Sequence, residues 1–127
     1  MSKHDPTVTL RQIADHAGRI QELCEACTLP DLLKDWKLTA AFEREMQVLG
    51  EAVKRLPADL VARYPQIPWR EIAGTRDRIS HGYDETDYNI LWDAAKNDVP
   101  ALVATVRQML ADLQAVPKAA DVDKDRP

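Results

Sequence analysis

The sequence holds little of what builds disulfide-rich, membrane-spanning or β-sheet proteins. Two cysteines among 127 residues cannot form a disulfide framework at this size, which indicates a reducing compartment. No signal-like apolar run follows Met1 and no window reaches the length of a membrane span, so we expect a cytoplasmic protein that makes no membrane contact. Four glycines and one phenylalanine, with few β-branched runs, favour helices over strands.

The sequence also lacks the basic excess that proteins wrapping long nucleic acids usually carry. It has 17 basic and 21 acidic residues and a formal net charge of −4. Any contact with RNA must therefore be local. Residues 63–81 offer such a place, because four arginines there accompany only two acidic residues. These are Arg63, Arg70, Arg76 and Arg78, with Glu71 and Asp77.

Apolar residues recur at steps of three and four through the first half of the chain, which predicts amphipathic helices. Asp5 marks the start of the first helix, with a proline in its first turn. Thr28 predicts a second start and a short helix through Trp36. A long helix then runs to about Leu56. Gly50 lies inside it, where glycine costs roughly 1 kcal/mol relative to alanine, so we expect another helix to pack closely there.

The second half continues the helical pattern after a short turn at residues 58–63. A helix is predicted to start near Pro68 and to pass through Ile79, with Gly82 just beyond its end in a left-handed conformation. Asp87 and the preceding threonine predict the start of a further helix. Pro100 marks a kink or a new start within it.

These elements together predict one all-α domain over residues 1–116. We expect an up-down helical bundle of four main helices plus short helices, because neither strand alternation nor an internal repeat is present. A glycine-rich phosphate loop is also missing. Residues 117–127 show no apolar periodicity and are predicted to be a disordered C-terminal tail.

The cysteine pair has a spacing that resembles a metal or redox motif. Zinc requires four ligands, and neither His4 nor His16 is placed to complete a site with Cys24 and Cys27. A spacing of three puts both thiols on the apolar face of the first helix. We interpret them as small buried hydrophobic residues, assign no role to the two histidines, and expect no bound metal.

The three tryptophans could offer a stacking surface for bases. Trp69 and Trp92 lie on apolar helix faces, however, which favours packing in the core. Trp36 does not lie on such a face.

Residues 76–83 combine two arginines, a hydroxyl, an imidazole and a phenol, which are groups that metal-free RNA cleavage requires. A base must take the proton of the 2′-hydroxyl, an acid must protonate the leaving 5′-oxygen, and a cation must stabilise the charge on phosphorus. The imidazole of His81 titrates near neutrality and suits the first two tasks. The guanidinium of Arg76 matches phosphate oxygens.

Helical geometry would separate the two groups. Five residues on a helix turn by about 500°, which displaces Arg76 from His81 by about 140° around the axis. A two-fold dimer that brings two such segments together would supply two of each group to one phosphate. The residues alone leave a plain alternative open, in which Arg76 pairs with Asp77 or Glu71 and His81 caps a helix end.

The segment resembles a known motif. Arg76, His81 and Tyr83 match the R-x4-6-H-x-Y signature of HEPN-domain proteins in the HepT-like branch. Residues 50–56 and 64–74, together with Trp92, match the flanking sequence of that branch. The resemblance covers residues 10–113.

This resemblance implies an all-α homodimer whose two motifs face one another in a cleft. It also implies an endoribonuclease, independent of metal and of any cofactor of its own, that cuts RNA, with tRNA one candidate substrate. In this family the enzyme is the toxin of a toxin–antitoxin pair. Its antitoxin is an MntA-type minimal nucleotidyltransferase that transfers AMP from ATP to a tyrosine. By position, Arg76 and His81 are catalytic and Tyr83 accepts AMP.

Four further residues are expected to support RNA binding: Arg70, Asp77, Arg78 and Ser80. The residue after the motif arginine is often asparagine in the family, and Asp77 lowers the local positive potential. The alternative function is a non-catalytic HEPN module that binds a nucleotide or RNA for a partner nucleotidyltransferase. A bundle that serves assembly alone is disfavoured by the polar cluster at residues 76–83.

Overall fold

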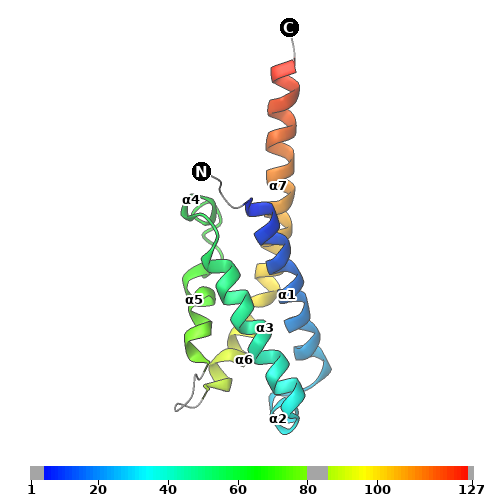
Figure 1. The fold of residues 1–127 in the computed structure, drawn as a ribbon, viewed down its shortest axis with the longest axis vertical. Coiled ribbons are helices and arrows are strands. Elements are labelled where there is room, and N and C mark those ends of the chain that lie inside the picture. Colours follow the sequence, from blue (N-terminus) through cyan, green and yellow to red (C-terminus); the bar gives the residue numbers. More distant parts are fainter. Residues whose placement is uncertain (1–4, 80–85, 126–127) are drawn as a thin grey trace.

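Three long helices run along the length of the bundle in the computed structural model (Figure 1). It describes residues 5–79 and 86–125, with side chains up to residue 115. The long helices are α1 (Pro6–Ala26), α3 (Trp36–Lys54) and α7 (Val99–Asp125). The shorter elements are α2 (Leu29–Lys34), α4 (Ala58–Val61), α5 (Trp69–Gly74), the 3₁₀ helix η1 (Thr75–Arg78) and α6 (Tyr88–Asn97). The predicted all-α class is confirmed, and no strand occurs in the described ranges.

The helix starts follow the capping residues of the sequence. The Asp5 carboxylate accepts the N–H two residues on at 2.9 Å and begins α1, and the Thr28 hydroxyl caps α2. Both predicted starts are confirmed. A third cap at Asp35 accepts two backbone N–H groups, which makes Trp36 the first residue of α3 rather than the end of the short helix. Capping of this kind stabilises a helix by about 1 kcal/mol.

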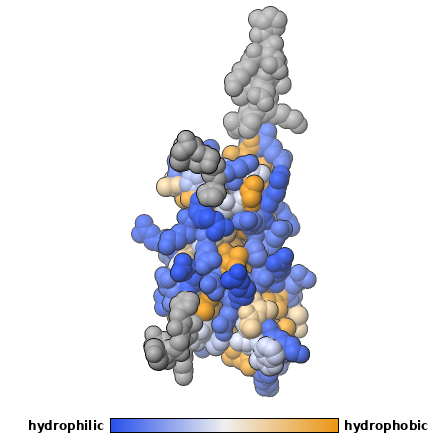
Figure 2. Space-filling view, in the orientation of Figure 1, coloured by the Kyte–Doolittle hydropathy of each residue, from blue (hydrophilic) through white to orange (hydrophobic). Residues whose placement is uncertain are grey.

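The core lies where α1 packs along α3 and α7. It is built almost entirely from aliphatic side chains with no exposed surface, among them Leu10, Ile13, Ile20, Leu49 and Leu102. The space-filling view shows hydrophobic side chains scattered over a mainly hydrophilic face (Figure 2). None of the described helices is long and apolar enough to cross a membrane. Burial of the three apolar faces against one another therefore supplies most of the stability.

The break predicted near Pro100 separates two helices. α6 ends at Asn97, and α7 begins at Val99 after Asp98. The backbone of α7 then stays helical through Pro117 to Asp125, and its last turns project beyond the other helices (Figure 1). The helix thus ends later than the sequence pattern predicted. Two alanines, which are strong helix formers, follow Pro117 and favour this continuation. A domain boundary after residue 116 stays a prediction.

Gly50 brings α5 onto α3. A Cβ atom at this position would lie 3.1 Å from the carbonyl oxygen of Ala73 and 3.2 Å from that of Ile72. Such distances are shorter than ordinary van der Waals contact, so a larger residue would push the two backbones apart. The expectation that another helix packs closely against Gly50 is confirmed.

Candidate functional site

The candidate site begins on α5, which is fixed at both ends. The indole N–H of Trp69 donates to the carbonyl of Tyr64 at 2.9 Å. At the other end, the hydroxyl of buried Thr75 donates to the carbonyl of Ile72 at 2.7 Å and also faces Gly50. A short helix cannot be stable by itself. Its place against α3 therefore depends on packing, through the close approach of Gly50 to the carbonyls of Ile72 and Ala73 and the burial of the Ile72 side chain.

The long helix expected through Ile79 is not present, and this prediction is wrong. α5 ends at Gly74, one 3₁₀ turn follows, and Ile79 then adopts an extended conformation (φ −92°, ψ 128°). The side chain of Ile79 is 5% exposed and belongs to the core, so the chain leaves helical geometry where it buries this residue. The displacement of about 140° between Arg76 and His81 assumed one continuous helix and does not apply, because helical geometry ends before Ile79. Gly82 lies outside the described residues.

Arg76 stands on η1 with a side chain that is 37% exposed. Its Nε atom lies 3.9 Å from a carboxylate oxygen of Asp77, whose side chain is 80% exposed. This distance is too long for a hydrogen bond, and exposed ion pairs contribute little. The pairing with Asp77 considered from the sequence thus exists only as a loose contact. The Arg76 guanidinium makes no ion pair with Glu71 in the described part of the chain.

A groove of about 700 Å³ lies between the α5–η1 segment and α6. Arg70, Asp77 and Arg78 line it, so the structure brings together three of the four residues predicted to support RNA binding. Arg76 is not among the lining residues. Ser80, His81 and Tyr83 lie outside the described residues, and their placement stays a prediction.

The groove also contains acidic residues that the sequence pattern did not suggest. Asp93 and Asp98 line it together with Glu71. Burial, and secondarily the charge of Glu71, raises the pKa of the Asp98 carboxyl. Asp98, which directly follows α6, was not among the residues predicted to form the site. Asp93 and Asn97, four residues apart on α6, share a helix face, and this spacing was the available signal for that wall of the groove.

The two walls of the groove are joined where the motif segment begins and ends. The N–H of Asp87 donates to the carbonyl of Arg78 at 3.2 Å. The Asp87 carboxylate then accepts the N–H of Ile90 and caps α6, as predicted. The residues on either side of the motif's histidine and tyrosine are thereby bonded directly to each other.

A chain with this fold and motif matches known proteins along most of its length. The family described as "Ribonuclease HepT-like" matches residues 13–109. The chain belongs to the HepT-like ribonuclease family. Both the resemblance and the enzyme class expected from the sequence are thus confirmed.

Several relatives of this HepT-like chain carry ribonuclease names. "Putative RNase MJ0127" of Methanocaldococcus jannaschii is 35% identical over 114 residues, which are 90% of this chain and 94% of that protein. "Probable ribonuclease HepT" of Thermococcus cleftensis is 38% identical over 93 residues, 73% of this chain and 84% of that protein. "Putative RNase TTE0752" of Caldanaerobacter subterraneus is 34% identical over 105 residues, 83% and 94% of the two chains. No solved structure matches significantly.

The other candidate groups of the HepT-like chain are structural. Cys24 and Cys27 are free and half-buried, and both pack against the core. Cys27 lies just beyond the end of α1, where its thiol donates to the carbonyl of Leu23. Burial raises the pKa of the Cys24 thiol. These features agree with small hydrophobic residues, although half-buried ones. No group of three or more potential metal ligands occurs among the described residues, and the absence of a metal stays a prediction.

The tryptophans divide as the sequence indicated. Trp69 and Trp92 pack against the core, and the ring of Trp92 lies 5.4 Å from that of Phe42. Trp36 is 75% exposed at the start of α3.

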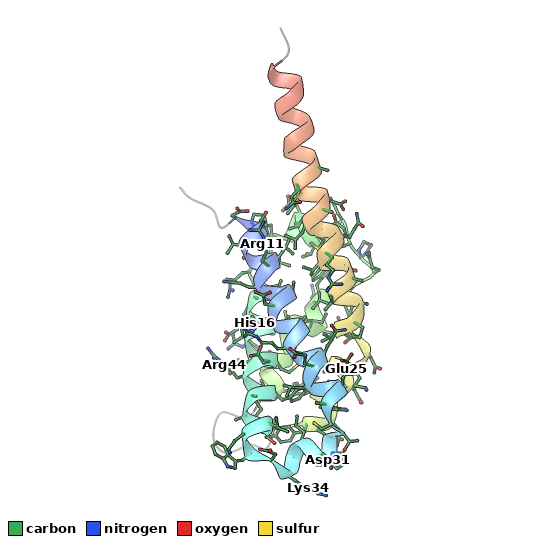
Figure 3. The ribbon with its side chains drawn as sticks, turned by 90° about the vertical axis from the view of Figure 1, so that its right-hand side faces the viewer. Arg11, His16, Glu25, Asp31, Lys34 and Arg44 are labelled. Atoms are coloured by element: carbon green, nitrogen blue, oxygen red, sulfur yellow. The ribbon has the colours of Figure 1, made fainter. Side chains whose placement is uncertain are left out.

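His16, for which no role was predicted, joins α1 to α3 through Glu45 (Figure 3). Its Nδ1 atom lies 2.6 Å from a carboxylate oxygen of Glu45. Arg19 reaches the same carboxylate at 3.4 Å. The spacing of His16 and Arg19 on one helix face was the available signal for this contact. It links two helices of the core and lies on elements other than those that carry the motif.

Proposed function

We propose that this HepT-like ribonuclease is the toxin of a toxin–antitoxin pair, a metal-independent endoribonuclease that AMP transfer to Tyr83 inactivates. The observation that carries the proposal is the family match over residues 13–109, which includes Arg76, His81 and Tyr83. The position of Arg76 supports it, because among the described residues its partly exposed guanidinium makes only a distant ion-pair contact, with Asp77.

The cleavage chemistry follows from these residue types. His81 takes the proton of a 2′-hydroxyl, whose oxygen attacks the adjacent phosphorus, and the 5′-oxygen leaves with a proton from an acid. Arg76 stabilises the negative charge that develops on the phosphate oxygens. The products are a 2′,3′-cyclic phosphate and a 5′-hydroxyl. Hydrolysis by a metal-activated water would not require the cyclic product, so the RNA ends identify the mechanism.

The active unit in this proposal is a homodimer in the cytoplasm. Arg76 lies on a 3₁₀ turn that ends before extended Ile79, so helical spacing does not support a shared site. The family resemblance alone does. In a two-fold dimer each cleft would receive an arginine and a histidine from both protomers.

The chemistry of the other tyrosines supports Tyr83 as the AMP acceptor. The chain has three tyrosines. The hydroxyl of Tyr64 donates to Asp112, and that of Tyr88 donates to Glu43. Both bonds, together with burial, raise the pKa of the phenols. A phenol held this way is a poor nucleophile for the α-phosphorus of ATP, since it must lose its proton and its partner.

AMP on Tyr83 would act one residue away from Gly82 and two from His81. The phenol oxygen bonds to the α-phosphorus, pyrophosphate leaves, and the phenolic proton is lost. The added phosphate brings bulk and negative charge to the place that receives RNA phosphate, so it opposes substrate binding by repulsion.

The cleavage proposal is tested with purified protein and total RNA in the presence of a chelator. We expect RNA fragments with cyclic phosphate ends, and Arg76→Ala and His81→Ala should each lower the rate by about 100- to 1,000-fold. Arg11→Ala removes an exposed guanidinium from α1 (Figure 3) and should leave the rate unchanged. Cleavage by both site variants at the wild-type rate would show the assignment to be wrong. RNA binding without cleavage by the wild type would favour the non-catalytic module.

The regulation is tested by incubation with ATP and the candidate nucleotidyltransferase, followed by intact mass measurement. We expect AMP adducts on the wild type and on Tyr64→Phe, and none on Tyr83→Phe. An adduct on Tyr83→Phe would overturn the assignment. Growth arrest on expression of the chain alone, relieved by the partner, tests the toxin role.

The dimer is tested by refolding the Arg76→Ala and His81→Ala variants together, so that mixed dimers form. A shared cleft in the mixed dimer retains one arginine and one histidine, so activity should exceed that of either parent. Sedimentation of the wild type as an active monomer would exclude the shared site.

A further inference from the structure

One polar side-chain bond ties the start of α6 to α3. Tyr88, the first residue of α6, donates its hydroxyl to the carboxylate of Glu43, and both groups are partly buried. Burial, with the Glu43 bond as the second cause, raises the pKa of Tyr88 to about 12. The phenol therefore keeps the proton that makes it a donor throughout the physiological range of pH.

The residue before Tyr88 is bonded in two directions. The N–H of Asp87 donates to the carbonyl of Arg78 on η1, and its carboxylate caps α6. The chain that leaves η1 at Arg78 and returns at Asp87 includes His81 and Tyr83. The Tyr88–Glu43 bond thus holds the point at which the two ends of this segment meet.

A neighbouring contact shows what the polar bond adds. Phe42 precedes Glu43 on α3, and Trp92 lies one turn after Tyr88 on α6. Their rings are 5.4 Å apart at an angle of 55°. This apolar contact keeps α6 on α3 but tolerates small shifts, because dispersion is weakly directional. A hydrogen bond to a carboxylate is directional, and so it defines the position of the first turn.

We propose that Tyr88 and Glu43 are positioning residues of the ribonuclease site. Their hydrogen bond fixes the first turn of α6 on α3 and, through the Asp87–Arg78 bond, holds both ends of the segment that carries His81. The inference rests on the proposed function insofar as His81 acts on RNA. Neither residue is assigned contact with the substrate.

The chain supplies a matched control for this proposal. Tyr64 donates its hydroxyl to Asp112 on α7 at 2.5 Å, a second long-range bond between a tyrosine and a carboxylate. Tyr64→Phe and Tyr88→Phe each remove one hydroxyl. Only the Tyr88–Glu43 bond lies beside the segment that carries the motif. The carbonyl of Tyr64 that holds Trp69 is unaffected by the substitution.

We expect Tyr88→Phe to lower kcat for RNA cleavage by about 10- to 100-fold, since a displacement of about 1 Å is sufficient for such losses. KM should change little. Tyr64→Phe should keep kcat within about twofold, while both variants lose similar thermal stability. Glu43→Gln retains an acceptor oxygen and should keep most of the activity, whereas Glu43→Ala should resemble Tyr88→Phe. Equal losses of kcat in Tyr88→Phe and Tyr64→Phe would overturn the proposal.

A second measurement does not depend on cleavage. Hydrogen exchange of the Asp87 amide, followed by NMR, reports the bond to Arg78 directly. Tyr88→Phe should speed this exchange by about tenfold or more, and Tyr64→Phe should not. If the wild type cuts no RNA, the proposed function fails. Faster exchange in Tyr88→Phe would still show that the Tyr88–Glu43 bond stabilises the Asp87–Arg78 bond. Equal exchange rates in the two variants would overturn the positioning role of the Tyr88–Glu43 bond, whatever the result with RNA.

Discussion

The molecule has two regions that differ in how their residues are held. The frame, made of α1, α3 and α7, consists of long helices whose apolar faces bury each other. The edge, made of α5, η1 and α6, consists of shorter elements that each bury only a few side chains against the frame, among them Ile72, Ile79 and Leu91. Exposed arginines and a groove of about 700 Å³ occur in the edge. Stability is concentrated in the frame, which lets the edge carry charged groups that a core would not tolerate.

The largest effect on stability is expected from a cavity in the frame. Ile13 on α1 has no exposed surface, and Ile13→Ala should lower the free energy of unfolding by about 2–5 kcal/mol. The kcat of the folded fraction at low temperature should remain near the wild-type value. Chemical denaturation and initial rates measure the two quantities. A loss of kcat at full folding would show that the frame and the edge are not separable in this way.

Gly50 tests the joint between the regions. The added methyl group of Gly50→Ala would lie 3.1 Å from the Ala73 carbonyl, so α5 must shift away from α3. We expect a destabilisation of about 1–3 kcal/mol from overpacking, and a loss of cleavage that is larger than for Ile13→Ala. Gly74→Ala is the control, because a Cβ atom there meets nothing within 4 Å. Activity that survives in Gly50→Ala would mean that the position of α5 does not matter.

A charge at the edge should affect binding and leave stability unchanged. Arg78 is exposed and lines the groove. Arg78→Ala should change the unfolding free energy by no more than about 0.5 kcal/mol. It should weaken RNA binding and reduce the slope of log affinity against log salt by about 1, as expected for one lost phosphate contact. Filter binding at several salt concentrations measures this slope, and an unchanged slope would place Arg78 outside the RNA path.

The sequence was sufficient for the frame because its signals there are local. The caps at Asp5 and Thr28, and apolar residues at helical spacing, depend on neighbours along one helix. Gly50 was informative because glycine destabilises a helix interior, which indicates that another backbone packs closely there. The edge was predicted less well. The turn from η1 into extended Ile79 is set by burial against residues distant in sequence, and no local pattern encodes it.

The groove was missed for the same reason, since Asp93 and Asp98 meet Glu71 only in the folded chain. The Tyr88–Glu43 bond joins residues 45 positions apart. By contrast, the roles proposed for Arg76, His81 and Tyr83 rest on their types and spacing, which a short motif contains. The HepT-like family could thus be predicted from the sequence where the geometry of the groove could not.

The smallest expected effect contrasts one carboxylate of the edge with one of the frame. Burial and Glu71 raise the pKa of Asp98, so folding disfavours its ionised form. The contribution of Asp98 to stability should therefore fall as the pH rises through the ordinary carboxyl range, and Asp98→Asn should be more stable than the wild type at pH 7 but not at about pH 3.5.

Asp112 on α7 should show the opposite sign. The hydrogen bonds from Tyr64 and then Gln108 lower its pKa, so folding favours its ionised form, and the stabilisation is lost as the pH falls through its folded pKa. Asp112→Asn should therefore be less stable than the wild type at pH 7 and similar to it in acid. The difference in melting temperature between each variant and the wild type, measured across this pH range, reports the contribution of each carboxylate. If both differences change with pH in the same direction, the groove does not impose a different pKa shift on Asp98 than α7 imposes on Asp112.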